Sequence, residues 1–262
     1  MRFTAALRRN RLAAPLVMVA ALVATGAAYA AIDSSTSAVQ AAVTTETSVT
    51  QGKMLFAEGC SSCHGLNAEG TTDGPSLIGV GAAAVDFQVS SGRMPMATQG
   101  IQAPRKESIY SEEEIAALAA WVASLAPGPA IPTDEDINTA GANLAEGGEA
   151  FRVNCAQCHN FAGQGGALTG GKYAPNLNKA TARQIYEAML TGPQNMPIFS
   201  DETLPKEQKR AIIAYIEEMR NGANPGGLDL GKYGPVTEGL FAWTAGFLLL
   251  IVAAVWIGVK AK

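Results

Sequence analysis

The sequence predicts an all-α protein with two similar helical domains in tandem, a C-terminal transmembrane helix, and an N-terminal signal or anchor helix. Three observations support this architecture. The pentapeptide Cys-x-x-Cys-His occurs at residues 60–64 and again at 155–159, each time within the same order of helical patterns. Both ends of the chain are apolar. The length of 262 residues suits two domains of roughly 80 to 100 residues plus these ends.

The N-terminal segment, residues 1–32, begins with four arginines and continues as an apolar run interrupted by Pro15 and Gly26. Two alternatives remain for it: a secretory signal with Ala28-Tyr29-Ala30 as the small-residue cleavage site, or an uncleaved membrane anchor. Residues 33–48 are rich in Ser, Thr and Ala and have no periodic apolar face. We therefore expect a tether there.

The first domain, residues 49–126, is expected to contain three helices. The first runs over 52–59 into the first pentapeptide, and the second covers 83–90. The third follows a Ser-Glu-Glu-Glu cap at 111–114 and has apolar residues at helical spacing. A Gly-rich irregular segment that ends at Pro75 separates the first two helices.

The second domain, residues 144–222, repeats this order. Its helices are expected over 147–154, over 182–190, and from about Lys206 onward. Its Gly-rich segment ends at Pro175. The two domains therefore share one predicted fold, with corresponding positions about 95 residues apart.

The last helix of each domain is expected to cross the first helix at a glycine, where missing side-chain bulk allows close approach. In the first domain Trp121 would pack across Gly52 and Phe56. The corresponding residues of the second domain are Tyr215, Gly147 and Phe151.

Two linkers and a membrane span complete the chain. Residues 127–143 combine prolines with acidic residues, and 223–239 are Gly-rich, so both are predicted as linkers. Residues 240–259 carry no charge, and about 20 helical residues cross the roughly 30 Å hydrocarbon core. Trp243 and Trp256 lie near the two ends of this run, where interfacial aromatics belong.

The distribution of charge predicts the orientation in the cell membrane. All 23 acidic residues lie between Asp33 and Glu238, together with 13 of the 19 basic residues, which gives this region a net charge of −10. The flanks carry only Arg and Lys. The positive-inside rule therefore predicts that both termini are cytoplasmic and that the two domains lie on the outer side. A negative region of this size argues against a nucleic-acid partner.

The two pentapeptides are typical of covalent attachment sites for c-type haem, in which both sulfurs form thioethers and the histidine becomes the proximal iron ligand. The first set is Cys60, Cys63 and His64, and the second is Cys155, Cys158 and His159. These are all the cysteines and histidines of the chain. A zinc site would have to mix the two sets, and a thioredoxin-like site would have one CxxC in a βαβ pattern. We therefore predict two covalently bound haems c.

The sixth iron ligand cannot be a histidine of this chain, so methionine, lysine or an open position remains. His/Met ligation is the form that raises the potential of an electron-transfer haem. Met94 and Met196 each precede a proline in corresponding loops and are the predicted ligands. Met96 is the fallback for the first haem, while Met189 falls in a helical apolar pattern and is set aside. Two six-coordinate haems would leave no open position for a substrate.

Each repeat, with its CxxCH, later proline, Met-Pro dipeptide and terminal aromatic helix, resembles the class I cytochrome c domain. That resemblance implies that the carbonyls of Pro75 and Pro175 accept hydrogen bonds from His64 and His159. Two such domains before a C-terminal anchor resemble the dihaem cytochrome c subunit of actinobacterial cytochrome bc complexes. Residues 74–81 and 85–95 carry this closer match, and the resemblance covers nearly the whole chain.

The resemblance implies an electron-transfer subunit of a quinol:cytochrome c reductase, a translocase, with no catalytic residue in this chain itself. Electrons would pass from the Rieske iron-sulfur subunit through the first and then the second haem to the copper A centre of an aa3-type oxidase. A cytochrome b subunit would be the other partner, within a dimeric supercomplex.

Two alternatives share the same motifs. One is a membrane-anchored dihaem electron acceptor of a dehydrogenase, which differs only in its partner. The other is a dihaem peroxidase, which would need one haem with an open axial position.

Overall fold

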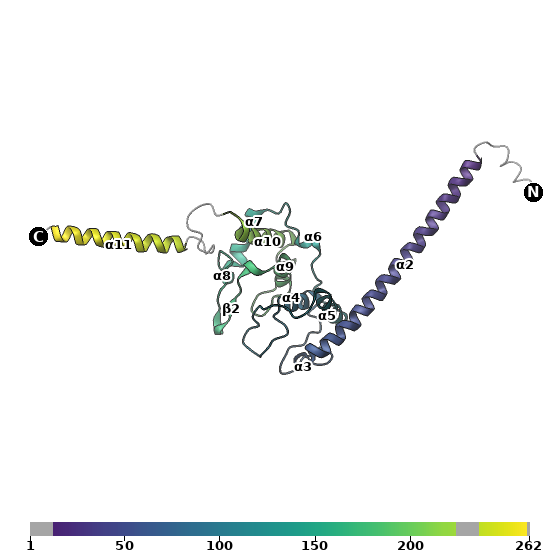
Figure 1. Ribbon diagram of the computed structural model, residues 1–262, viewed down its shortest axis with the longest axis horizontal. Coiled ribbons are helices and arrows are strands. Elements are labelled where there is room, and N and C mark those ends of the chain that lie inside the picture. The colour runs from purple at the N-terminus through teal and green to yellow at the C-terminus, as the bar shows by residue number, and fades with distance from the viewer. Residues whose placement is uncertain (1–12, 224–235, 261–262) are drawn as a thin grey trace, which may run out of the picture.

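The structure is a computed structural model that describes residues 13–223 and 236–260. Two helical domains lie side by side in the centre, and one long helix extends from them toward each end of the chain (Figure 1). The only strands among the described residues are two residues long each, β1 (Gly166–Ala167) and β2 (Tyr173–Ala174), which pair antiparallel. The all-α prediction is therefore confirmed.

Helix α2 runs without a break from Ala13 to Gly59. Residues 33–48, where we expect a tether, form the middle of this helix. No proline or glycine occurs between residues 27 and 51, and alanine is the strongest helix former. A helix without an apolar face has no surface that packs on the domain, but its residues can still favour the helical backbone. The apolar part, Pro15–Ala30, is compatible with both a signal and an anchor.

The first domain is built on the C-terminal end of α2. The other helices of this domain are α3 (Ser61–His64), α4 (Ala82–Ser90) and α5 (Glu112–Leu125). The predicted cap of α5 is present, since Ser111 and Glu114 form a reciprocal capping box. The core between α2, α4 and α5 includes Phe56, Val85, Val89, Leu118 and Trp121.

The second domain repeats this arrangement. Its helices are α7 (Leu144–Asn154), α8 (Ala156–His159), α9 (Ala182–Thr191) and α10 (Lys206–Asn221), with 3-10 turns η1 (Thr169–Gly171) and η2 (Leu177–Lys179). The short helix α6 (Asp134–Ile137) precedes them in the linker. Helix α9 ends as predicted at Gly192, whose φ of 57° is left-handed. The hairpin of β1 and β2 was not predicted, because strands of two residues are too short to show an alternating pattern.

The predicted crossing of helices at glycine is present in the first domain. A Cβ atom on Gly52 would lie 1.9 Å from the carbonyl oxygen of Ala117 on α5. The rings of Phe56 and Trp121 lie 4.3 Å apart between their centroids. The two backbones therefore touch where the side chain is missing.

The crossing in the second domain differs in one detail. A Cβ atom on Gly147 would lie 2.0 Å from the carbonyl oxygen of Ala211, so this glycine does bring α7 against the backbone of α10. Tyr215, however, lies beside Gly148, whose added Cβ would be 3.0 Å from its Cε2 atom. The Phe151 and Tyr215 rings are 5.5 Å apart.

The segment between the domains, predicted as a linker over 127–143, is held at both ends. The carbonyl of Pro129 accepts a hydrogen bond from Ala83 N at 3.1 Å. Beyond it, Asp136 in α6 forms an ion pair with Lys206 at 2.7 Å. The linker therefore packs on each domain in turn.

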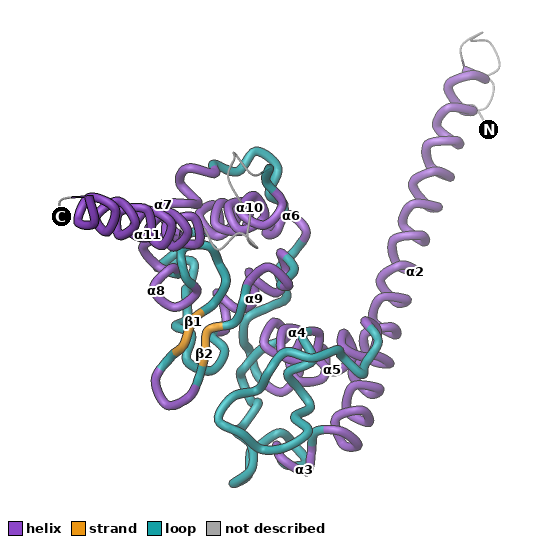
Figure 2. The backbone as a smooth tube through the Cα atoms, turned by 60° about the vertical axis from the view of Figure 1, so that its left-hand side comes forward, coloured by secondary structure: helices purple, strands orange, loops and turns teal. Residues whose placement is uncertain are grey.

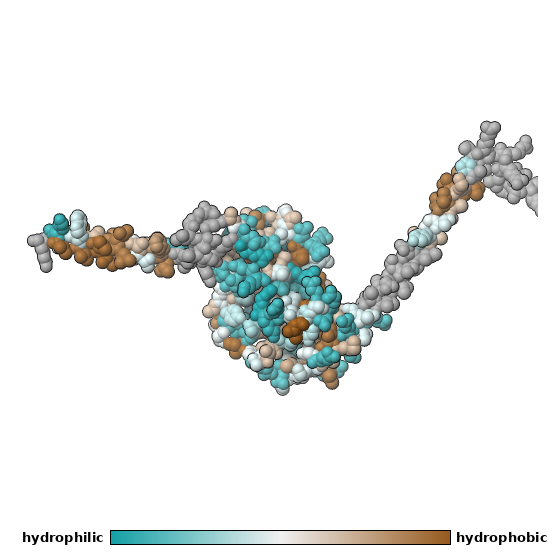
Figure 3. Space-filling view, in the orientation of Figure 1, coloured by the Kyte–Doolittle hydropathy of each residue, from teal (hydrophilic) through white to brown (hydrophobic). Residues whose placement is uncertain are grey.

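Helix α11, Val236–Lys260, contains the predicted span over 240–259. Within the described residues, the stretch Glu238–Lys260 is the helix long and apolar enough to cross a membrane, and none of it is buried by the rest of the protein. Apolar side chains cover it in Figure 3. Residues 224–235 of the predicted second linker lie outside the described residues.

The two domains meet where α4 lies against α9, as both ribbon and tube views show (Figures 1 and 2). Asp86 of α4 and Glu187 of α9 are both buried there. Among the described residues, neither oxygen of the Glu187 carboxyl has a hydrogen-bond partner. Burial and the neighbouring Asp86 carboxyl raise the pKa of Glu187 to about 10, which Arg183 offsets only in part. Glu187 is therefore protonated at neutral pH.

This buried acid makes stability depend on pH. The pKa of Glu187 is near its ordinary value of 4.5 in the unfolded chain and is raised in the folded chain. Below pH 4.5 the titration of Glu187 therefore costs the folded state nothing. As the pH rises from 4.5 toward 10, the free energy of unfolding falls by at most about 1.4 kcal/mol per pH unit. In the Glu187→Gln variant the side chain keeps nearly the same shape but can no longer ionise. We expect it to melt at the same temperature as the unchanged protein at pH 5 and roughly 5 °C higher at pH 8.

Thermal unfolding in detergent, measured at both pH values, checks this prediction. Glu149→Gln, a change at an exposed residue of α7, is the control and should leave both melting temperatures unchanged. Equal melting temperatures of the Glu187→Gln and unchanged proteins at pH 8 would contradict the prediction.

Candidate haem-binding sites

The first candidate site begins where α2 ends. The backbone N–H groups of Cys63 and His64 donate to the carbonyl of Cys60 at 3.2 and 3.0 Å. One helical turn therefore brings both cysteines and the imidazole together. Gly65 follows with a φ of 80°, which turns the chain away from this helix.

The imidazole of His64 is fixed from behind. Its Nδ1 atom lies 2.8 Å from the carbonyl oxygen of Pro75, the contact that the resemblance implied. Gly74 makes room for it, because a Cβ there would lie 3.1 Å from Nδ1 and 2.7 Å from the carbonyl of Cys63. With Nδ1 donating to a carbonyl, Nε2 of the neutral ring is left as an electron-pair donor for a metal.

The second site has the same local geometry. Cys158 N and His159 N donate to the carbonyl of Cys155 at 3.1 and 2.9 Å. The Nδ1 atom of His159 lies 3.0 Å from the carbonyl oxygen of Pro175. Burial lowers the pKa of His159, against the opposing effect of this hydrogen bond. The ring is therefore kept neutral, as a metal ligand must be.

The cysteines do not resemble those of a thiol-exchange site. Burial, with a smaller contribution from the neighbouring Cys63, raises the pKa of Cys60 to about 11. Burial and Cys158 likewise raise the pKa of Cys155 to about 12. Thioredoxin-like sites lower the pKa of the attacking thiol instead. No group of three or more His, Cys, Asp or Glu side chains in the described part of the chain could hold a zinc ion.

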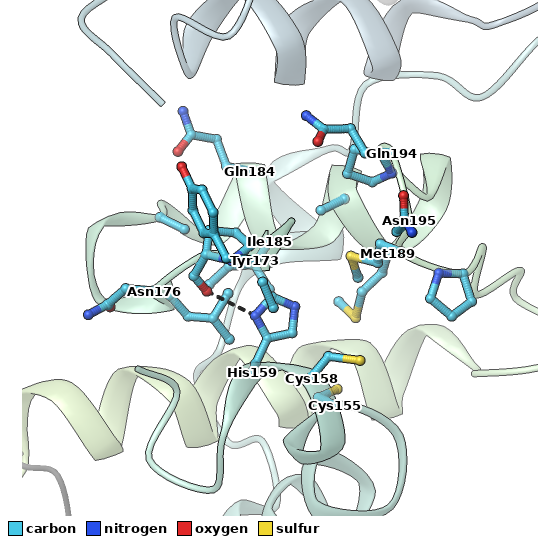
Figure 4. A pocket seen from close by; sticks show the side chains of 18 of the residues that line it. Cys155, Cys158, His159, Tyr173, Asn176, Gln184, Ile185, Met189, Gln194 and Asn195 are labelled. Carbon is cyan, nitrogen blue, oxygen red and sulfur yellow. Dashed lines mark hydrogen bonds between the residues drawn. The ribbon is translucent and has the colours of Figure 1, made fainter. Parts of the chain in front are cut away.

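A cavity of about 230 Å³ opens over the second site. Cys155, Cys158 and His159 line it together, as Figure 4 shows. Apolar side chains from three helices and a loop form much of the remaining lining, among them Phe151, Ile185, Phe199, Ile212 and Ile216. The cavity therefore has a mainly apolar lining and carries the two thiols and the imidazole on one side.

Two methionines line this cavity, and the sequence pointed to one of them. Met196, the predicted ligand, comes from the loop after α9. Met189 comes from α9 itself and is only 2% exposed. A helical apolar pattern gave no sign that Met189 would face the same cavity. In the first domain, Met94 packs on the core cluster around Phe56, whereas Met96 is not among the described residues that pack there.

Three cations also line the cavity. They are Arg93, Arg105 and Lys172, and no Asp or Glu is among the described residues of the lining. Arg93 lies over the ring of Phe87, with Cζ 4.8 Å from its centroid. Burial, together with the positive charge of Arg105, lowers the pKa of Arg93. Thiols and an imidazole on one side, a mainly apolar lining, and cations without acidic neighbours in the lining fit a haem, which is flat and apolar and carries two carboxylates.

Comparisons with known proteins agree with this chemistry in both domains. A family model described as "Cytochrome c" matches residues 49–126, and one described as "Cytochrome C oxidase, cbb3-type, subunit III" matches residues 142–216. The matches cover the two candidate sites separately, one in each domain.

Three curated relatives show how far the similarity extends. The "Cytochrome bc1 complex cytochrome c subunit" of Corynebacterium efficiens is 50% identical over 226 residues, which are 80% of this chain and 76% of that protein. The protein of the same description from Mycobacterium tuberculosis is 46% identical over 259 residues, 97% of this chain and 92% of the relative. The "Cbb3-type cytochrome c oxidase subunit FixP" of Azorhizobium caulinodans is 32% identical over 187 residues, 66% of this chain and 60% of that protein.

Proposed function

The chain belongs to the family of cytochrome c subunits of cytochrome bc1 complexes, and we propose that it carries electrons from a Rieske iron-sulfur subunit to the copper A centre of an aa3-type oxidase. It is a dihaem electron-transfer protein of the respiratory chain, with two covalently bound haems c in two cytochrome c domains. The observation that carries the proposal is the doubled site, with identical Cys-x-x-Cys-His turns and His-to-proline contacts in both domains.

The axial ligands of this proposal are one nitrogen and one sulfur per haem. His64 and Met94 would bind the first iron, and His159 and Met196 the second. The supporting contacts are those that hold each imidazole by Nδ1 and place Met196 on the wall of the second cavity.

When bound, the haem supplies one-electron chemistry, its iron alternating between ferric and ferrous states. The residues of this chain hold and shield it. The carbonyls of Pro75 and Pro175 orient the imidazoles, and apolar residues such as Ile185 and Phe199 keep water from the second cavity. His64, Met94, His159 and Met196 would hold the two irons, and electrons would then pass without a substrate binding to the metal.

The membrane helix α11 would keep the two domains at the surface of the cell membrane, next to the other subunits. We propose that the domains lie on the outer side and that the termini are cytoplasmic. The basic residues at the flanks and the net charge of −10 between them support this orientation. A tethered carrier would replace a soluble cytochrome c between reductase and oxidase.

Purification in mild detergent through a tag on this chain tests the partners. We expect a cytochrome b subunit, a Rieske subunit and an oxidase with copper A to co-purify, with spectra of c, b and a haems. A quinoprotein or flavoprotein dehydrogenase in their place would contradict the proposal and support the dehydrogenase alternative. Carbon monoxide binding together with peroxide turnover would instead support a peroxidase.

The choice of Met94 over Met96 gives a further prediction. Replacing Met94 with Ala removes the proposed sulfur ligand of the first haem, so the thioether-to-iron absorption band of that haem is expected to disappear. Met96→Ala is the matched control and should keep this band, because Met96 is not among the described residues that pack on the core cluster around Phe56, whereas Met94 is. Visible absorption spectra of the two oxidised variants check the prediction. The reverse result would assign the ligand to Met96.

A further inference from the structure

The cavity of the second domain is completed by the first domain. Phe87, Arg93, Gln102 and Arg105 all belong to the first cytochrome c domain, yet they line the cavity that contains His159. Two of these four are arginines. Of the three cations that line the second haem site, the second domain itself therefore supplies only Lys172.

Arg93 is held in this position and has unused hydrogen-bonding capacity. The residue is only 8% exposed, and its guanidinium lies over the Phe87 ring. Its Nη1 atom is buried and has no hydrogen-bond partner within the described part of the chain. A buried cationic donor without a partner is costly, so a group that accepts from it is expected in the filled cavity.

Arg105 is fixed by a chain of contacts between the domains. Its Nη1 atom donates to Oε1 of Gln184 at 2.8 Å, and Nε2 of Gln184 donates to the Ser90 hydroxyl at 3.1 Å. Close by, the side chain of Gln102 bonds both the carbonyl and the N–H of Tyr173, at 2.6 and 2.9 Å. The loop that carries the two arginines is therefore docked on the second domain.

We propose that Arg93 and Arg105 of the first domain bind the carboxylate side chains of the haem attached to the second domain. The three cations and the lack of any Asp or Glu among the described lining residues require an anion, and haem brings two carboxylates. Guanidinium groups suit this task, because they bind carboxylates in a planar, two-pronged geometry. This inference rests on haem occupancy of the second site, but not on the identity of the protein partners.

The contact has a consequence for electron transfer. Positive charge next to a haem favours the reduced form, which carries one positive charge less. Arg93 and Arg105 would therefore raise the reduction potential of the second haem. Because Arg93 directly precedes Met94, the same loop also contacts the first haem in the proposed ligation. The docked loop would thus favour electron flow from the first haem to the second.

Spectroelectrochemical titration of the full chain in detergent tests this inference. In Arg105→Gln the equilibrium constant for electron transfer from the first to the second haem is expected to fall about tenfold, which is about 59 mV for one electron. Arg105→Lys keeps the positive charge, so the reduction potential of the second haem should stay close to that of the unchanged protein. Arg152→Gln removes an exposed arginine of α7 that does not line the cavity, and should change the constant less than twofold. Arg93→Gln is a second variant with the same expected direction.

Several outcomes would overturn the inference. One is an unchanged constant in both Arg105→Gln and Arg93→Gln; another is an equal change in Arg152→Gln. A wild-type potential that shifts when phosphate or chloride is titrated would show that the arginines bind a free anion instead of the haem carboxylates. Covalent haem content, measured on each denatured variant, separates these outcomes from a failure of the haem assignment itself.

Discussion

Replacing Met196 with Ala is expected to lower the reduction potential of the second haem by on the order of 0.2 V, since axial ligands set haem potentials over a range of about 0.8 V. A thioether ligand favours ferrous iron, and its loss leaves water or an open position. Because 59 mV corresponds to a tenfold change for one electron, the shift amounts to roughly a thousandfold. Electrons would then stay on the first haem, and quinol-driven reduction of the oxidase would stop.

The control for this prediction is the second methionine of the same cavity. Met189→Leu changes a side chain that lines the same cavity and is more deeply buried than Met196, but it conserves volume and apolar character. Its potential should stay near that of the unchanged protein. Carbon monoxide binding to the reduced protein gives an independent check: Met196→Ala should bind it and Met189→Leu should not. The opposite pattern would make Met189 the ligand and remove Met196 from the site.

The local chemistry of the two sites could be predicted from sequence because it depends on short spacings. The positions of Cys60, Cys63 and His64 follow from a single helical turn, and this turn is present. The contact of His64 with Pro75 was implied by the resemblance to class I cytochromes c and is present at 2.8 Å. The ligand role of these residues stays a prediction that spectra must test.

Contacts between distant segments could not be predicted in this way. Arg93 and Arg105 line the second cavity because of the way the two domains dock. The spacing of apolar residues in a sequence predicts helices and strands but not the docking of domains. The same holds for the buried pair of Asp86 and Glu187, which looks like ordinary surface charge in the sequence. The helix over 33–48 could not be predicted for a different reason, since helix propensity continued where the apolar face ended.

The glycine crossings show what a repeated small residue does in this fold. At Gly147 the added Cβ would lie 2.0 Å from the carbonyl oxygen and 2.5 Å from the carbonyl carbon of Ala211. Both are backbone atoms within α10, so no side-chain rotation relieves the clash. The helices would have to move apart, and α7 leads directly into Cys155 and the second haem site.

Gly147→Ala is therefore expected to destabilise the second domain by about 3 kcal/mol, the upper range for overpacking, or roughly 15 °C in Tm. Gly148→Ala is a matched control in the same helix, equally buried. Its Cβ would meet ring and guanidinium atoms of Tyr215 and Arg152 at 3.0 to 3.2 Å, and flexible side chains can yield. It also gains about 1 kcal/mol of helix propensity. Thermal unfolding followed by haem circular dichroism should separate the two variants, and equal losses would mean that backbone contact does not limit this crossing.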